Sequence, residues 1–255
     1  QGSGKSTFCA LMEPILESAH DLRVVTLSID DVYRTRDERQ KLADAVHPLC
    51  AIRGVPGTHD MELADTLIHQ LLGGDGTVLI PRFDKATDDR KPPSAWDRVD
   101  APIDIVLFEG WCVGCPELPS WEAPYNHRER NEDPDGQWVR WSAACLDAMY
   151  TELFAKLDAL IMIAVPSMAT VRESRWRQEQ RLWELHAKSV RTPSRPAGLM
   201  SRDEVVDYVA LFERYTEHML QTLPARAEVL IKRHEAFHYT LERLPIFANT
   251  AEPLR

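Results

Sequence analysis

The sequence predicts an α/β fold in which a mostly parallel β-sheet is flanked by helices on both faces. Two observations lead to this prediction. Short β-branched runs alternate along the chain with longer stretches of helical periodicity, which is the order of repeated strand–helix–strand units. Several of these runs end in acidic residues, and ligands bind beyond the carboxyl ends of the strands in such sheets. We expect a single domain over residues 1–255, since 44% apolar residues are enough to form one large core.

The chain opens on a glycine-rich loop that leads into a helix. Residues 2–7 form the loop, and apolar residues then recur at helical spacing as far as Leu16. Residues 23–29 follow as a β-branched strand that ends in Asp30 and Asp31. Helical stretches at 38–45 and 62–72 flank a loop at 53–60, whose glycines and proline favour turns.

The second half of the chain continues the alternation. A strand at 77–80 runs into the polar loop 82–85, and a strand at 103–108 ends at Glu109. After a proline-rich insertion, a helix is predicted at about 137–156 and a strand at 159–165. The charged helix 171–185 and the proline-containing loop behind it predict a lid at about 166–198. A helix at about 202–223 and a strand at 227–232 come last.

Composition and charge exclude several classes of partner. The formal charge of -10 argues against a nucleic-acid or anionic-membrane surface, because both require positive fields. No apolar run approaches the length of a membrane span, and no signal segment opens the chain. Five scattered cysteines fit a reducing compartment better than a disulfide scaffold. We expect a protein that acts on a small molecule. Its default location is the cytoplasm, and an organelle-targeting segment stays open because the chain begins at Gln1 rather than methionine.

The glycine-rich loop matches the end of the phosphate-binding pattern G-x-x-x-x-G-K-[ST]. The first glycine of that pattern would lie before Gln1, so we expect an N-terminally truncated P-loop domain whose first strand is missing from this chain. In such a loop the backbone amides face phosphate oxygens, Lys5 reaches the β- and γ-phosphates, and the Ser6 hydroxyl binds Mg²⁺. The predicted nucleotide-binding residues are Gly2, Ser3, Gly4, Lys5, Ser6 and Thr7.

Glu109 completes the predicted metal site. An acid that ends a buried apolar strand fits the second motif of nucleotide sites, in which a carboxylate holds or orients the hydrated metal. With Ser6, it predicts that the chain uses ATP and Mg²⁺.

Asp30 and Asp31 lie where an acceptor hydroxyl should approach the γ-phosphate. A carboxylate there can accept the hydroxyl proton and orient the oxygen for in-line attack. Because adjacent residues of a strand face opposite ways, we expect only one of the two to play this role and the other to bind metal or cap a helix.

Three basic clusters are candidates for binding phosphate or a substrate carboxylate, since a guanidinium suits both groups. They are Arg53 with His59, Arg82 with Lys85, and Arg172 with Arg175 and Arg177. The last cluster lies on a charged helix, which favours an ordinary solvated face, although its place after Pro166 suits a closing lid.

Two further patterns have simpler explanations. Cys112 and Cys115 form a C-x-x-C, but the prolines that follow leave no helix whose N-terminus could lower a thiol pKa. His234 and His238 lack the glutamate of a zinc hydrolase motif and are expected to be ordinary polar positions.

Together, five segments resemble the D-glycerate 3-kinase family, which belongs with the uridine kinase, phosphoribulokinase and pantothenate kinase group of P-loop proteins. The segments are residues 2–7, 28–33, 53–60 (Arg-Gly-Val-Pro-Gly-Thr-His-Asp), 82–85 (Arg-Phe-Asp-Lys) and 108–111 (Phe-Glu-Gly-Trp). The resemblance implies ATP-dependent phosphorylation of a small hydroxy acid, D-glycerate to 3-phosphoglycerate. It also implies that Asp30 is the catalytic base, with Lys5 and Arg175 as further catalytic residues. The implied substrate-binding residues are Asp31, Tyr33, Arg53, His59, Asp60, Arg82, Asp84 and Lys85.

Three alternatives remain at this point. The acceptor is another small hydroxylated metabolite, such as a nucleoside, a pantothenate-like acid or a sugar phosphate. The chain is a nucleotide-binding regulatory protein without an acceptor. The Cys112–Cys115 pair makes it a thiol redox protein.

Overall fold

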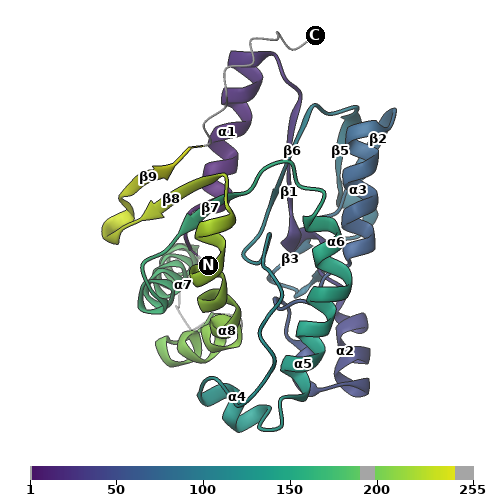
Figure 1. Ribbon diagram of the computed structural model, residues 1–255. Coiled ribbons are helices and arrows are strands. Elements are labelled where there is room, and N and C mark those ends of the chain that lie inside the picture. Colours follow the sequence, from purple (N-terminus) through teal and green to yellow (C-terminus); the bar gives the residue numbers. More distant parts are fainter. Residues whose placement is uncertain (1, 190–198, 245–255) are drawn as a thin grey trace.

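The computed structural model describes residues 2–189 and 199–244. Two pairs of parallel strands carry the fold (Figure 1): β1 (Val24–Ser28) with β6 (Ile105–Glu109), and β7 (Ile161–Ala164) with β8 (Val229–Arg233). Helices pack on both pairs, so the predicted α/β architecture is confirmed. In the part of the chain that the structure describes, no helix has the length and apolar character needed to cross a membrane.

The helices bury their apolar sides against these strands. The helix α1 (Lys5–His20) packs on β1 and β6, α3 (Met61–Gly73) packs on β6, and α8 (Arg202–Arg226) packs on β7 and on α7 (Met168–Ser189). Fully buried side chains from β1, α3 and α8 meet in one core, among them Leu27, Leu71 and Tyr215. Burial of this kind stabilises a fold by about 25 cal/mol for each Å² of apolar surface removed from water.

The parallel sheet is divided among the described residues. One edge of β6 and one edge of β7 face a mainly apolar cleft of about 410 Å³, and no described strand pairs with either edge. The central strand that the sequence predicts ahead of the phosphate loop stays a prediction.

Two antiparallel strands, β5 (Asp97–Ala101) and β9 (Tyr239–Arg243), were not predicted. The predicted strand at 77–80 is β2 (Gly76–Ile80), and it pairs antiparallel with β5 outside the parallel pairs. The strand β9 likewise pairs antiparallel with β8. Polar residues dominate both missed strands, and their extended form depends on the neighbouring strand more than on a local apolar pattern. The other additions are β3 (Phe83–Asp84), β4 (Asp89–Arg90) and α4 (His127–Glu132).

Several predicted helices differ in their boundaries, and two of them show a local cause. The helix expected at 137–156 consists of α5 (Gln137–Cys145), a π-helical turn at Leu146–Tyr150 and α6 (Thr151–Phe154). The helix expected at 38–45 is α2 (Arg36–Ala45), which begins earlier because Thr35 and Glu38 form a capping box at its N-terminus.

The loop at 53–60 packs closely against the helices beside it. Its backbone is fixed by three side chains: Tyr150 accepts from the Gly57 amide at 2.8 Å, while Ser142 and Trp111 donate to the carbonyls of Pro56 and Gly54, each at 2.8 Å. Both glycines have positive φ, 134° at Gly54 and 100° at Gly57. The loop is therefore a rigid support beneath the polar residues described below.

We expect Gly57→Ala to lower the free energy of unfolding by about 3 kcal/mol, from the positive φ and from overpacking together. An added Cβ would lie 2.4 Å from the Trp141 ring, so either the ring or the loop must move. Urea unfolding of both proteins would measure the change. Gly73→Ala is the matched control, because a Cβ there meets nothing within 4 Å. Equal unfolding midpoints for Gly57→Ala and the control would contradict the prediction.

Candidate active site

The predicted site residues gather at the carboxyl ends of β1 and β6. The parallel register places Ser28 opposite Glu109, so Asp30 lies just beyond β1 at the same end of the sheet as Glu109. The N-terminus of α1 lies at this end too, because the Ser6 hydroxyl donates to Glu109 Oε1 at 2.8 Å. Residues from three separate segments thus form one polar region.

The phosphate loop has the shape of a backbone cradle. Gly4 is the N-cap of α1 with a φ of 99°, and Gly2 has a φ of 65°. Residues other than glycine rarely adopt these backbone conformations. A Cβ on Gly2 would lie 2.7 Å from Ser174 Cβ in α7, and one on Gly4 would lie 2.6 Å from the Tyr239 hydroxyl. The loop therefore has no room for a side chain at Gly2 or Gly4, and its amides and the α1 N-terminus suit a bound phosphate.

The Ser6–Glu109 pair fits the predicted metal. A hydroxyl and a carboxylate are the hard oxygen ligands that Mg²⁺ takes, and they lie in contact at the N-terminus of α1. Among residues 2–189 and 199–244 there is no group of three or more His, Cys, Asp or Glu residues placed to hold a metal. A magnesium ion here would therefore take its remaining ligands from phosphate oxygens and water.

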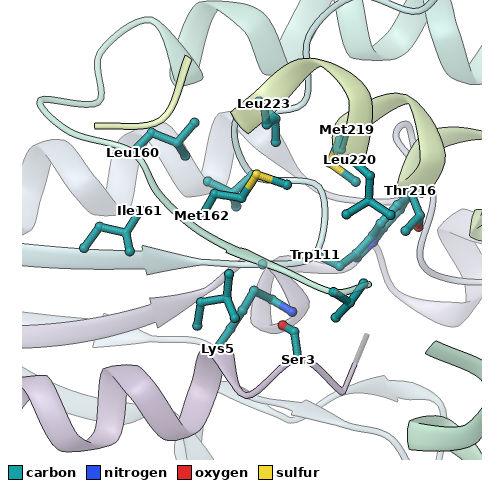
Figure 2. Close-up of a pocket in the computed structure, with 14 residues that line it drawn as sticks. Ser3, Lys5, Trp111, Leu160, Ile161, Met162, Thr216, Met219, Leu220 and Leu223 are labelled. Carbon is teal, nitrogen blue, oxygen red and sulfur yellow. The ribbon is translucent and has the colours of Figure 1, made fainter. Parts of the chain in front are cut away.

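Lys5 borders a small pocket of about 80 Å³ between the phosphate loop and α8. Figure 2 shows Lys5 and Ser3 reaching this pocket from the loop, while Met219, Leu220 and Leu223 approach it from α8. No described carboxylate forms an ion pair with Lys5, so its charge is available to an anion.

Asp30 is held at both carboxylate oxygens. The Tyr33 hydroxyl donates to Oδ1 at 2.9 Å and Lys85 Nζ donates to Oδ2 at 2.7 Å. Burial by itself would raise the pKa of Asp30, but the charge and hydrogen bond of Lys85 outweigh it and leave that pKa below its ordinary value. Asp30 is therefore an oriented, ionised carboxylate at neutral pH.

Asp31 has a different role. Arg82 Nη1 donates to its Oδ2 at 2.6 Å and the Phe83 amide donates to its Oδ1 at 3.1 Å, so both oxygens anchor the start of the loop 82–85. Asp30 and Asp31 lie on a 3₁₀ turn (Ile29–Val32) beyond β1, and the prediction that they continue the strand was wrong. Arg82 also pairs with Asp97, so its guanidinium joins Asp31 to Asp97.

His59 packs against Tyr33, the residue that donates to Asp30. The His59 ring stacks on Tyr33 with centroids 4.5 Å apart, and His59 Nδ1 lies 2.8 Å from the Tyr150 hydroxyl. His59 is fully buried, which lowers its pKa to about 3 and keeps the ring neutral. Direct contact between His59 and a substrate was predicted, whereas the structure places His59 behind Tyr33.

Three other predicted substrate residues also form contacts within the protein. Asp60 accepts from the Leu63 amide at 3.1 Å and caps α3. Asp84 accepts from the Ala86 amide at 2.9 Å in the turn after β3. Arg53 pairs with Asp88, and its guanidinium lies 5.5 Å from the Phe83 ring centre. Arg53 also lies near Tyr208, because its charge opposes the rise that burial causes in the pKa of that tyrosine.

Tyr208 of α8 is a site residue that the sequence analysis missed. Burial raises its pKa, and the nearby charges of Arg53 and Arg175 oppose that rise, with Asp30 and Lys85 also close enough to act on it. The Arg175 guanidinium lies 5.6 Å from the Tyr208 ring centre. Nothing in the local sequence marks Tyr208, because one tyrosine in an amphipathic helix resembles an ordinary packing residue.

The three arginines predicted in the last basic cluster, all on α7, have carboxylate partners. Arg172 pairs with Glu213, Arg177 pairs with Glu173 at 3.1 Å, and Arg175 pairs with the buried Glu179 at 2.5 Å. Of the three, Arg175 alone is placed beside Tyr208. The predicted lid extends over residues 190–198, which lie outside the described residues, so lid closure stays a prediction.

The cysteine pair gives no support to a redox site. Cys112 and Cys115 are fully buried thiols in the main core, and burial raises the pKa of both, that of Cys115 to about 12. A protonated, inaccessible thiol is a poor nucleophile.

The chain is similar in sequence to kinases and in fold to a solved structure. No family model matches the chain. The chain is 32% identical over 220 residues to the uncharacterized kinase mug58 of Schizosaccharomyces pombe, a match that covers 82% of this chain and 74% of that protein. It is 28% identical over 260 residues to the chloroplastic D-glycerate 3-kinase of Arabidopsis thaliana, covering 98% of this chain but only 53% of that protein. Among solved structures, the YGR205w protein superposes with a TM-score of 0.68 at 22% identity, over 96% of this chain and 87% of that one.

Proposed function

Since this chain belongs to the D-glycerate 3-kinase family of ATP-dependent kinases, we propose that it transfers the γ-phosphoryl group of ATP to a hydroxyl of a small hydroxy acid, with D-glycerate as the first candidate. The Arabidopsis relative carries D-glycerate in its name, and the match covers 98% of the present chain. The chain spans about half of that protein, so the substrate is part of the proposal.

One observation carries the proposal. The Asp30 carboxylate is held by Tyr33 and Lys85 at the same end of the sheet as the Ser6–Glu109 pair. A phosphate cradle, an oxygen pair suited to Mg²⁺ and an oriented base are the parts that phosphoryl transfer to a hydroxyl needs. A protein that only bound nucleotide would have no use for the third.

The proposed step begins with the acceptor hydroxyl beside Asp30. Its oxygen forms a bond to the γ-phosphorus while the bond from that phosphorus to the bridging oxygen breaks and ADP leaves. The hydroxyl proton passes to Asp30. Lys5 and the loop amides stabilise the charge on the phosphates, and bound Mg²⁺ would supply further neutralisation between Ser6 and Glu109.

Two arginines in the same region are candidate partners for the acceptor's carboxylate. Arg53 and Arg175 both act on Tyr208, and Arg175 lies against its ring. Because a guanidinium binds a carboxylate through two parallel hydrogen bonds, we assign the acid group of the substrate to this pair.

The test is ADP release with MgATP and a panel of acceptors that contains D-glycerate, L-glycerate, pantothenate, a nucleoside and a sugar phosphate. We expect D-glycerate to give the highest rate and 3-phosphoglycerate as product. ADP release with D-glycerate no faster than without an acceptor would refute the substrate. Tight ATP binding with no turnover on any acceptor would instead favour a regulatory protein.

A further inference from the structure

The β8–β9 hairpin is attached to the phosphate loop. Arg233, the last residue of β8, donates from Nη1 to the Gly2 carbonyl at 2.7 Å, and the Tyr239 hydroxyl donates to the Ser3 carbonyl at 3.0 Å. These residues lie more than two hundred positions from the loop in sequence. The sequence predicts a strand at 227–232 but gives no role to Arg233 or Tyr239, so neither contact was foreseen.

Arg233 is a buried cation whose charge is not neutralised by a described carboxylate. Arg233 is only 4% exposed, and its Nε has no hydrogen-bond partner within the described parts of the chain. Burial lowers the pKa of Arg233, and the nearby charge of Arg177 acts in the same direction. Among the described carboxylates, none forms an ion pair with Arg233.

Phe237 covers the Arg233 guanidinium. The guanidinium carbon lies 4.1 Å from the centre of the Phe237 ring, and this ring is itself 46% exposed. The hairpin turn presents the ring through a left-handed backbone with a φ of 58°, which is rare for an aromatic residue. The turn is closed by the His234 amide, which donates to the His238 carbonyl at 2.7 Å.

An unneutralised buried cation is unfavourable unless an anion accompanies it. The backbone beside Arg233 is the phosphate loop, whose positive φ angles at Gly2 and Gly4 suit a polyphosphate. Arg233 lacks an anionic partner among the described residues, and the phosphates of a bound nucleotide would supply one.

We propose that Arg233 is a nucleotide-binding residue that attracts the polyphosphate and positions the phosphate loop through the Gly2 carbonyl, with Phe237 holding its guanidinium in place. This inference rests on the proposed function only in that the loop takes ATP. It makes the β8–β9 hairpin part of the nucleotide site.

The test is calorimetric binding of ATP, ADP and AMP in the presence of magnesium and without an acceptor. Because Arg233 interacts with phosphate charge, Arg233→Gln should weaken ATP binding about tenfold or more, ADP binding less and AMP binding least. Lys232→Gln is the matched control, since Lys232 is exposed on the same strand and pairs with Glu242. The control should bind all three nucleotides as the unmodified protein does.

Two further variants separate a nucleotide role from a structural one. Phe237→Leu leaves Arg233 present but removes the ring that stacks on it, at a half-exposed position. This variant should weaken ATP binding most, ADP binding less and AMP binding least, with an unchanged melting temperature. Arg233→Lys keeps the charge and should recover part of the ATP affinity that Arg233→Gln loses. If Arg233→Gln does not fold, these two variants decide the question.

The proposal is overturned if the folded Arg233 variants and Phe237→Leu bind ATP as the unmodified protein does, or if the losses are equal for ATP and AMP. A protein that binds ATP in an Arg233-dependent manner but phosphorylates no acceptor would refute the proposed function alone. Turnover of D-glycerate with Arg233-independent ATP affinity would refute this inference alone.

Discussion

Asp30→Asn should lower the turnover number by a factor of about one hundred or more, because it removes the group that accepts the hydroxyl proton. The amide keeps the size of the side chain. Its one oxygen can accept from Lys85 and its NH₂ can donate to the Tyr33 hydroxyl oxygen, so both neighbours keep a hydrogen-bond partner. We expect the melting temperature and ATP affinity to change little. Steady-state kinetics with the best acceptor and saturating MgATP would measure the effect.

Asp31→Asn is the matched comparison for this variant. Asp31 bonds Arg82 and the Phe83 amide, so its loss should mainly lower stability and the order of the loop 82–85. The pattern expected is a large loss of turnover with normal stability at position 30 and the reverse at position 31. Retention of turnover within about threefold in Asp30→Asn would rule out Asp30 as the base, since loss of a general base has a much larger effect.

The lowered pKa of Asp30 also sets the acid limit of activity. A carboxylate whose pKa is depressed stays ionised, and hence able to accept a proton, at every pH above that value. Acidification should therefore remove the base only below the ordinary carboxyl range.

Lys5→Met should lower turnover by a factor of about one hundred or more, because a preorganised charge on the transferring phosphoryl group is lost. Lys5 forms no ion pair with a described carboxylate, so its removal should leave the fold intact. Turnover number, ATP affinity and melting temperature should be measured together, and we expect the first to change most.

Lys41→Met is the control for the loss of a lysine. Lys41 is exposed on α2, outside the phosphate loop and the acceptor region, and its replacement should leave turnover unchanged. Comparable turnover in Lys5→Met and Lys41→Met would exclude a role for Lys5 in the transfer step.

The sequence predicts those residues of the candidate site that lie next to the helix or strand that positions them. The loop before α1, the acid at the end of β6 and the carboxylates beyond β1 are all adjacent in sequence to the elements that place them. Arg233 and Tyr208 were missed because their significance comes from what they approach, namely the Gly2 carbonyl and Arg175. A single arginine at a strand end or a single tyrosine in a helix has no local pattern that predicts such a neighbour.

The fold shows the same division. Helices α1, α3 and α8 and strands β1, β6 and β7 follow from apolar periodicity, which is a property of each segment by itself. The strands β5 and β9 depend on pairing with β2 and β8, and their polar sequences do not indicate it. Pairing partners lie on other segments, so periodicity could not have placed these strands in a sheet.

The sequence by itself determined the class of chemistry, because a Gly-Lys-Ser loop, strand-terminal acids and clustered arginines limit what the chain can bind. Only the tertiary structure decided the role of each residue. Asp30 and Asp31 are chemically identical neighbours, yet Lys85 and Tyr33 orient the first while Arg82 and the Phe83 amide occupy the second. The physical reason is that the charge and orientation of a carboxylate depend on donors within hydrogen-bond distance, and folding brings those donors from distant parts of the chain.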